Sequence, residues 1–249
     1  MSAAERPIQE RLERASLYRL LGGALARPQA ERLAELAAAA EALAPAIEPA
    51  VAEPLARFAT AVRETDAAAV GDEYVFLFDR GAKVPPYEGA WEDAPQLAGK
   101  AALLADVAGF YAAFGLVPGE AQPDVEDHIA AECEFMSALA LKEAYALAER
   151  DDEGVAITSA AQSRFVGDHL GRWSGAFAEA LRDASPLPYY GALADLLGAW
   201  VAAEIERLGA APSVVLGRSG YDPIQDADAF SCPMAEPEVM REDTGDEEP

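Results

Sequence analysis

Residues 129–148 read IAAECEFMSALALKEAYALA, and this stretch decides the fold class. Ile129, Cys133, Met136 and Ala140 follow the spacing i, i+4, i+7 and i+11, which places them along one face of an α-helix. Three other segments repeat this helical period. Their positions are Leu103, Val107, Phe110 and Phe114; Phe165, His169, Trp173 and Phe177; and Leu197, Val201, Ile205 and Leu208. The long periodic segments therefore predict helices.

The remaining segments are consistent with a helical fold. Alanine-rich stretches near 8–26, 30–43 and 50–69 also favour helix. The run YVFLF at 74–78 has strand propensity, but it sits among helices and has no neighbouring segment to pair with. We therefore expect an all-α helical bundle of about seven to nine helices, arranged as two helical parts joined by a hinge.

The composition indicates a folded protein with an acidic surface. Of its 249 residues 51% are hydrophobic, so a packed core is expected in one large domain or two small ones. The formal net charge is −25, from 19 Lys and Arg residues against 44 Asp and Glu residues. This balance argues against binding to nucleic acid or to an anionic membrane surface, because both need concentrated positive charge.

The compartment is inferred from missing signals. Cys133 and Cys232 are the only cysteines, and they do not make a disulfide framework. The N-terminal sequence lacks the uninterrupted apolar core of a signal peptide. No apolar stretch approaches the roughly 18–20 residues of a membrane span. We expect a cytoplasmic protein.

Proline, glycine and charge divide the chain. The stretch VPGEAQP at 117–123 separates two periodic segments and is the best hinge candidate. The segment 222–249 contains ten acidic residues and one basic residue, Arg241. We expect an N-terminal helical part at 1–117 with an aromatic loop at 84–91, a hinge at 118–124, a C-terminal helical part at 125–221, and an acidic, mostly disordered tail at 222–249. Within the tail, Phe230, Cys232 and Met234 are expected to dock back onto the bundle.

One metal site can be drawn from the sequence. Asp124, His128 and Glu132 lie at i, i+4 and i+8 on one helix face and could hold a metal ion. A ferritin-like di-iron bundle needs Glu-x-x-His on each of two helices, and this chain has valine three residues before both histidines. The alternative, which we favour, is that Asp124 caps a helix with Asp127 in its first turn.

Other reactive residues read as structural. His169 lies on an apolar stripe, where a histidine is usually a hydrogen-bonded core residue. Cys133 occupies a core-facing helical position, and a buried cysteine is unreactive. The sequence contains no GxGxxG, Walker, HExxH or GxSxG motif, so the common phosphate-binding and hydrolase sites lack support.

The segment 84–91, VPPYEGAW, is unusual between helices. Two prolines stiffen it, and Tyr87 and Trp91 offer large amphipathic surfaces. These aromatic residues either form a peptide-docking surface or cap a helix junction.

Four motifs in order resemble a known family. They are EYVFLF at 73–78, PPYE at 85–88 followed by Trp91, PDVEDHI at 123–129 leading into ECEFM at 132–136, and Phe165 with His169, Leu170 and Trp173. Together, over about residues 8–208, they resemble the TorD/DmsD/NarJ family of redox-enzyme maturation chaperones. Gly89 departs from the family's usual serine at this position.

The resemblance implies an all-α cytoplasmic protein that is not an enzyme and carries no cofactor. Such a chaperone binds the apo catalytic subunit of a molybdopterin oxidoreductase of the DMSO reductase family, or its twin-arginine leader, before cofactor insertion and export. It would act as a monomer or homodimer, without nucleic acid or membrane insertion. The implied client-binding residues are Tyr74, Leu77, Phe78, Pro86, Tyr87, Glu88 and Trp91, and the implied hinge residues are Asp127 and His128.

An acidic bundle with an exposed aromatic groove would suit such a client, since carboxylates attract the arginines and the groove buries the apolar run. Two alternatives remain open on the residues alone. One is a small metal-dependent enzyme on a helical bundle with His128 as a ligand, and the other is an acidic helical scaffold without a client.

Overall fold

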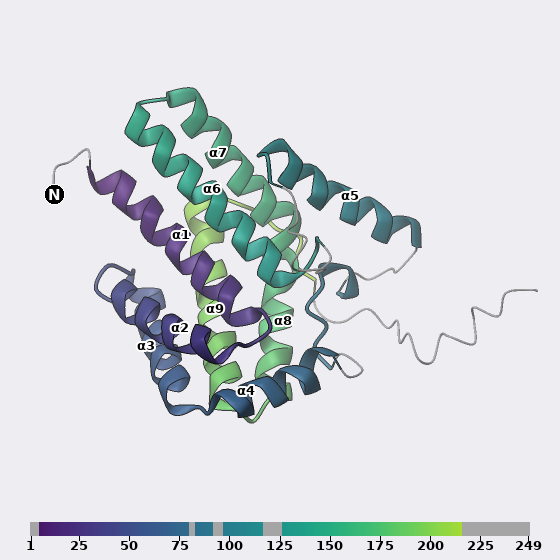
Figure 1. Ribbon diagram of the computed structural model, residues 1–249. Coiled ribbons are helices and arrows are strands. Elements are labelled where there is room, and N and C mark those ends of the chain that lie inside the picture. Colours follow the sequence, from purple (N-terminus) through teal and green to yellow (C-terminus); the bar gives the residue numbers. More distant parts are fainter. Residues whose placement is uncertain (1–4, 80–82, 92–96, 117–125, 216–249) are drawn as a thin grey trace, which may run out of the picture. The chain divides into compact units, whose positions relative to one another are not determined.

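The structure, a computed structural model, describes residues 5–79, 83–91, 97–116 and 126–215. Within these ranges the chain forms nine α-helices, drawn in Figure 1. They are α1 (Glu5–Leu25), α2 (Ala30–Leu43), α3 (Pro49–Glu64), α4 (Ala67–Tyr74), α5 (Leu97–Ala113), α6 (Ile129–Glu149), α7 (Asp152–Phe165), α8 (Gly171–Ala184) and α9 (Pro188–Leu208). The predicted all-α bundle is confirmed.

Three shorter helical segments join these helices. Val75–Asp79 and Val166–Leu170 are π-helical, and Glu88–Ala90 is a 3₁₀ turn. The YVFLF run is therefore the end of α4 followed by a π-helical segment, and not a strand. Because π-helical segments are rare and often lie at functional sites, the surroundings of these two segments are of interest.

Local sequence sets several helix ends. Asp66 begins α4, because its carboxylate accepts hydrogen bonds from the backbone N–H groups of Ala68 and Ala69. Pro188 occupies the start of α9, where its missing N–H is not needed. The same helix ends at Gly209, whose φ of 61° lies in the left-handed region that glycine adopts easily.

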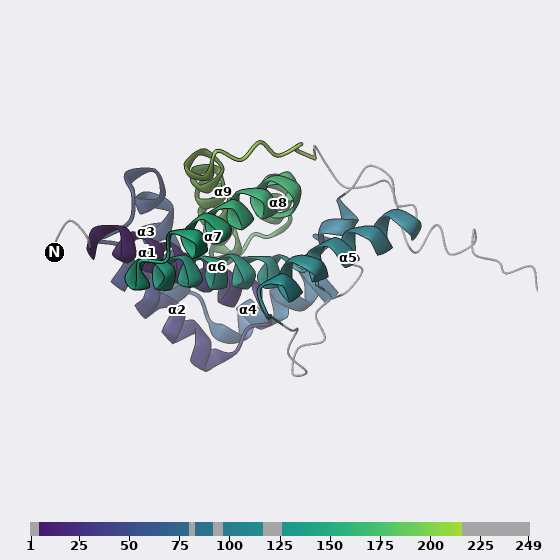
Figure 2. The ribbon, with the colours of Figure 1, turned by 90° about the horizontal axis from the view of Figure 1, so that it is seen from above.

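The core lies between α1, α6 and α9 and their neighbours. α1 packs along α6, and α9 packs against α3 and α8. Figures 1 and 2 both show α8 and α9 side by side. Tyr18 of α1 and Trp200 of α9 are fully buried and meet edge to face, with ring centroids 5.3 Å apart. Burial of such large rings supplies much of the stabilisation of a helical core.

The described residues between Glu5 and Val215 belong to one compact unit. Helices from both sides of the predicted boundary pack together within it, since α1 lies on α6 and α3 lies on α9. The predicted hinge at 118–124 and the predicted tail at 222–249 lie outside the described residues. In the described part, no helix combines the length and apolar character needed to cross a membrane.

A buried ionic network joins four helices. Arg14 of α1 donates to both carboxylate oxygens of Glu204 of α9, at 2.9 and 2.6 Å, and to Glu143 of α6 at 3.3 Å. It also donates to Gln162 of α7 at 2.7 Å, and Gln162 in turn donates to Glu143 at 2.8 Å. All four side chains are buried. Arg14 therefore holds α1, α6, α7 and α9 in one arrangement through charge-assisted hydrogen bonds.

The π-helical segment before α8 requires a glycine. The N–H of Gly171 donates to the carbonyl oxygen of Val166, five residues earlier. This geometry brings that oxygen against the place where a side chain at position 171 would begin, so a Cβ there would overlap it. Gly175, one turn further into α8, has open space in the same direction.

Gly171→Ala should lower the free energy of unfolding by about 1–3 kcal/mol, because the Val166 carbonyl would have to move. Gly175→Ala should raise it by about 0.5–1 kcal/mol, because glycine weakens a helix interior. Urea unfolding of both variants measures the difference. Equal effects of the two substitutions would show that the π-helical segment relaxes without cost.

Candidate functional site

The segment 83–91 is attached to the start of α6 by backbone hydrogen bonds. The N–H of Ile129 donates to the carbonyl of Pro86, and the N–H of Glu88 donates to the carbonyl of Asp127, both at 2.9 Å. Tyr87 and His128 form an isolated antiparallel bridge between these contacts. The predicted aromatic loop is therefore a short segment, extended at Tyr87 and followed by the 3₁₀ turn Glu88–Ala90, that is docked against the start of α6. We call residues 83–91 the strap.

Asp127 and His128 have specific structural roles in this attachment. The Asp127 carboxylate accepts a hydrogen bond from the backbone N–H of Gly89 at 3.0 Å. His128 is the N-cap of α6, where its Nδ1 accepts from the N–H of Ala130 at 3.1 Å. The His128 ring also meets the Tyr87 ring edge to face at 5.3 Å. Both residues thus position the strap.

The sequence analysis placed the start of this helix too early in the chain. Asp124 lies outside the described residues, and Asp127 precedes the helix instead of lying in its first turn. The physical reason is the pairing with the strap, which uses the backbone of Asp127 and leaves the helix to begin at Ile129.

Glu88 directs its carboxylate into the protein. One oxygen lies 3.0 Å from Nδ1 of His169, and the other lies 3.6 Å from Nη1 of Arg172. The opposite ring nitrogen of His169 is 3.3 Å from the Asp106 carboxylate of α5. His169 is buried and paired, as predicted for a core histidine. These contacts tie the strap to the second π-helical segment, to α8 and to α5.

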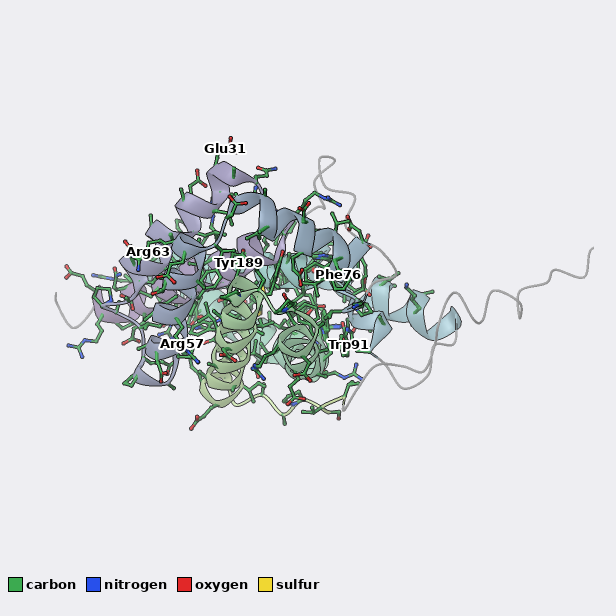
Figure 3. The ribbon with its side chains drawn as sticks, turned by 90° about the horizontal axis from the view of Figure 1, so that it is seen from below. Glu31, Arg57, Arg63, Phe76, Trp91 and Tyr189 are labelled. Atoms are coloured by element: carbon green, nitrogen blue, oxygen red, sulfur yellow. The ribbon has the colours of Figure 1, made fainter. Side chains whose placement is uncertain are left out.

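An aromatic cluster lies beneath the strap. Trp91 contacts Trp173 and Phe177 of α8, with ring centroids 6.4 and 6.1 Å apart, and its indole N–H donates to the carbonyl of Pro85 at 2.9 Å. Phe78 stacks on Phe177 at 6.3 Å. Figure 3 labels Trp91 and shows its place near α8. The strap is thus held by packing as well as by hydrogen bonds.

The prediction of an exposed aromatic groove was wrong for most of its residues. Trp91 is 1% exposed, and Tyr74, Leu77, Phe78, Pro86 and Glu88 are also buried. A proline-stiffened segment looks like a surface loop in the sequence, but here its side chains are covered by α8 residues that lie some eighty positions later in the chain.

Two aromatic rings of this region do reach the surface. Tyr87 is half-buried, and Phe76 of the first π-helical segment is 42% exposed. The Lys83 ammonium lies 3.9 Å from the centroid of the Phe76 ring, in the geometry of a cation–π contact. Sequence reasoning missed Phe76. Its position in the YVFLF run could have indicated this exposure. In a helical segment, Phe76 points away from the side on which Leu77 and Phe78 are buried.

Glu132 adds a buried carboxyl group below the cluster. It is fully buried, and one oxygen accepts from the indole N–H of Trp173 at 3.3 Å. Burial, with the nearby carboxylates of Glu88 and Asp127, raises the pKa of Glu132 well above its usual value. Burial also raises the pKa of Asp127, against the opposing effect of the Gly89 N–H. Glu132 is therefore expected to be held in its neutral form.

Glu132→Gln should raise the free energy of unfolding at pH 8 relative to that of the unchanged protein. Since the folded-state pKa lies above the unfolded value near 4.5, the contribution of Glu132 is fully present below pH 4.5 and is lost as pH rises toward the folded-state pKa. Glutamine keeps the acceptor for Trp173 and removes this loss. Urea unfolding should show the advantage of the variant growing between pH 5 and pH 8. An advantage independent of pH would mean that Glu132 is not neutral.

A metal centre finds no support in the described ranges. They hold no group of three His, Cys, Asp or Glu side chains placed to bind a metal ion. Cys133 is buried, and burial raises the pKa of its thiol well above the usual value, as expected for an unreactive cysteine. Cys232 lies outside the described residues.

The sequence matches the family of the nitrate reductase delta subunit over residues 44–179, more than half of the chain. The chain belongs to this family. The predicted resemblance to the TorD/DmsD/NarJ maturation chaperones is thereby confirmed. The matched residues of this delta-subunit family member include the strap, both π-helical segments and the start of α6. Family membership indicates a redox-enzyme maturation chaperone.

The comparisons with solved structures and with curated proteins add little to the family match. Among solved structures, the chain is similar to a putative redox enzyme maturation protein from Archaeoglobus fulgidus, with 20% sequence identity and a TM-score of 0.47. That similarity covers 73% of this chain and 91% of the other. No curated protein gives a significant match.

Proposed function

We propose that this family member is a cytoplasmic chaperone for one molybdopterin oxidoreductase of the DMSO reductase family. It binds the apo catalytic subunit, its twin-arginine leader, or both, and holds the client until the cofactor is inserted. It performs no catalysis of its own. The observation that carries the proposal is the family match, which spans the strap and its anchoring residues.

The client-binding residues implied by the resemblance divide by burial. Tyr87 is half-buried and Phe76 is exposed, so both are suited to direct contact with a client. The buried members form the support beneath them: Tyr74, Leu77, Phe78, Pro86, Glu88 and Trp91. Rigid aromatic rings on a fixed support make good anchors, because little conformational freedom is lost on binding.

Charge favours a client segment with arginines. The chain carries a net charge of −25, so a basic leader is attracted over a long range. Near the strap, the Asp106 side chain is exposed while it contacts His169. An exposed carboxylate near the strap complements an arginine that precedes an apolar run.

Cells that lack this protein should lose the activity of the client oxidoreductase, because its catalytic subunit stays without cofactor. The unchanged chain should restore that activity. A Phe76→Ala/Tyr87→Ala variant should restore less than about one tenth of it, because it lacks both aromatic rings that reach the surface in this region.

The matched control is Arg57→Ala, an exposed change on α3, which Figure 3 shows well apart from Trp91 of the strap. It should restore full activity, and immunoblots should show equal amounts of all variants. Normal oxidoreductase activity in cells without the protein would remove the proposed function. Full restoration by the Phe76→Ala/Tyr87→Ala variant would remove only the assignment of the surface.

A further inference from the structure

Helix α5 lies over part of the strap and over the second π-helical segment. In Figures 1 and 2 it occupies the edge of the bundle, with its N-terminal end pointing away from the other helices. Its first turns reach the strap, because a Cβ at position 89, in place of Gly89, would lie 3.7 Å from both Leu103 and Lys100 of α5. Its middle is joined to the π-helical segment by the 3.3 Å contact of Asp106 with His169.

The last turns of α5 are held by aromatic rings on one side of the helix. Phe110, Tyr111 and Phe114 each meet the ring of Phe135 of α6, with centroids 6.3, 4.8 and 6.1 Å apart. Phe110 also meets Phe165, at the end of α7, at 5.3 Å. The other side of α5 is exposed at positions 101, 102, 105, 109, 112 and 113. A helix that is packed on one side only opens at a lower free energy than the helices of the core.

The groups beneath α5 include polar atoms that lack partners. One carboxyl oxygen of Asp127 and one of Glu132 are buried and have no hydrogen-bond partner among the described residues. Burial, followed by the charge of Glu132, raises the pKa of the Tyr111 hydroxyl, so this α5 residue lies close to them. Buried polar atoms without partners are rare, and a ligand with several donors would supply partners here. We call Phe135, Phe165, Asp127 and Glu132 the covered surface.

The order of groups along α5 matches the covered surface. Burial raises the pKa of Asp127, and the Gly89 N–H and the Lys100 ammonium of α5 oppose this rise, so Lys100 faces the acidic end. An apolar stripe follows along the helix, at positions 103, 107, 110, 111 and 114. α5 thus presents a cation and then an apolar stripe, which is the order that the proposed function assigns to the client's leader.

The position of α5 also accounts for a buried residue that the resemblance implies in client binding. Glu88 lies 3.0 Å from His169, whose opposite ring nitrogen faces Asp106 of α5. Phe110 of α5 packs on the same histidine ring, at 5.5 Å between centroids. Removal of α5 would therefore open the side of His169 next to Glu88 and give a client access to this part of the strap.

We propose that α5 is a displaceable cover and that a segment of the client binds in its place on the covered surface. The inference rests on the proposed function, because the client is the occupant that replaces α5. In the free chain α5 keeps the aromatic rings from water and from other apolar segments. The apparent affinity for the client is then reduced by the fraction of molecules in which α5 is closed. Loosening α5 should therefore tighten client binding, whereas loosening a supporting element would weaken it.

The first measurement needs no client. The probe is a fluorescent synthetic peptide with the sequence of residues 97–116, and anisotropy follows its binding to the full chain. A Phe110→Ala/Phe114→Ala chain should bind this peptide at least tenfold more tightly than the unchanged chain does, because its own α5 competes less well. A peptide with the same two alanine changes should bind that variant at least tenfold more weakly than the unchanged peptide does.

The matched control chain is Leu141→Ala/Tyr145→Ala. It removes two exposed apolar side chains from α6, and peptide binding should change less than twofold. Circular dichroism and thermal unfolding verify that both double variants are folded. If Phe110→Ala/Phe114→Ala unfolds, Phe114→Ala alone takes its place, since it removes one half-buried ring from Phe135. This single variant should tighten peptide binding at least threefold.

The second measurement uses the apo catalytic subunit of the client. The Phe110→Ala/Phe114→Ala chain should bind it at least threefold more tightly than the unchanged chain does, and the 97–116 peptide should compete with it. The proposal is overturned if the peptide binds all three chains alike or none of them. It is also overturned if the apo subunit binds the variant more weakly, or if peptide and subunit bind together. If the apo subunit binds neither chain, the proposed function fails and the client's part in this inference fails with it, while the peptide still decides whether α5 is displaced.

Discussion

Arg14→Met should lower the free energy of unfolding by about 3–5 kcal/mol, because it leaves buried carboxylates without their cationic partner. The arginine holds Glu204 through two hydrogen bonds at 2.9 and 2.6 Å and contacts Glu143 at 3.3 Å. Without it, the cationic partner that remains to the fully buried Glu204 among the described residues is Arg207, at 2.9 Å. A buried carboxylate that has lost its main partner destabilises the folded protein far more than an exposed ion pair stabilises it. Urea unfolding at pH 7 measures the loss.

The control for this substitution is Arg57→Met. Arg57 also pairs with carboxylates, Glu53 and Asp195, but its side chain is 53% exposed. Exposed pairs contribute little, so this variant should stay within about 1 kcal/mol of the unchanged protein. An Arg14→Met/Glu204→Met double variant should lose less than the sum of the single losses, because it removes both charges together. Equal losses for Arg14→Met and Arg57→Met would contradict the role of the network.

Trp91→Ala should lower the free energy of unfolding by about 3–5 kcal/mol, because it empties the centre of the aromatic cluster. The lost contacts are those with Trp173 and Phe177, and the carbonyl of Pro85 loses its donor. The matched control is Phe76→Ala, which removes an aromatic ring that is 42% exposed from the neighbouring segment. That variant should lose less than about 1 kcal/mol.

The two variants should also differ in how they affect client binding. Phe76→Ala should weaken binding with little loss of stability. Trp91→Ala should weaken binding only in proportion to the loosening of the strap. A stable Trp91→Ala protein that no longer binds the client would restore Trp91 as a direct anchor and contradict its buried role.

The periodic segments were predictable because a helix buries a face that recurs along its own sequence. Residues 129–148 carry that repeat, and α6 covers them from Ile129 to Glu149. The expectation for His169 was correct for the same reason, since a polar residue on an apolar helical stripe has to be paired. Its partners, Glu88 and Asp106, could not be named, because both come from distant segments.

The errors arose where distant segments decide the outcome. The exposure of Trp91 depends on α8, and the start of α6 depends on hydrogen bonds from the strap. Arg14 had a weak signal that was not used: it lies on the buried side of α1, one turn before Tyr18. A buried arginine implies buried carboxylates, but the sequence does not indicate which of the 44 acidic residues supply them.

The central claim is that this member of the nitrate reductase delta subunit family recognises a molybdenum oxidoreductase before its cofactor is inserted. The most direct test is a calorimetric titration of the full chain with the client's catalytic subunit, purified once from cells unable to make molybdopterin and once in its cofactor-loaded form. The account predicts that the apo subunit binds at least tenfold more tightly, and that Phe76→Ala/Tyr87→Ala removes most of this preference. Equal affinity for the two forms, or no binding to the apo subunit, would contradict it.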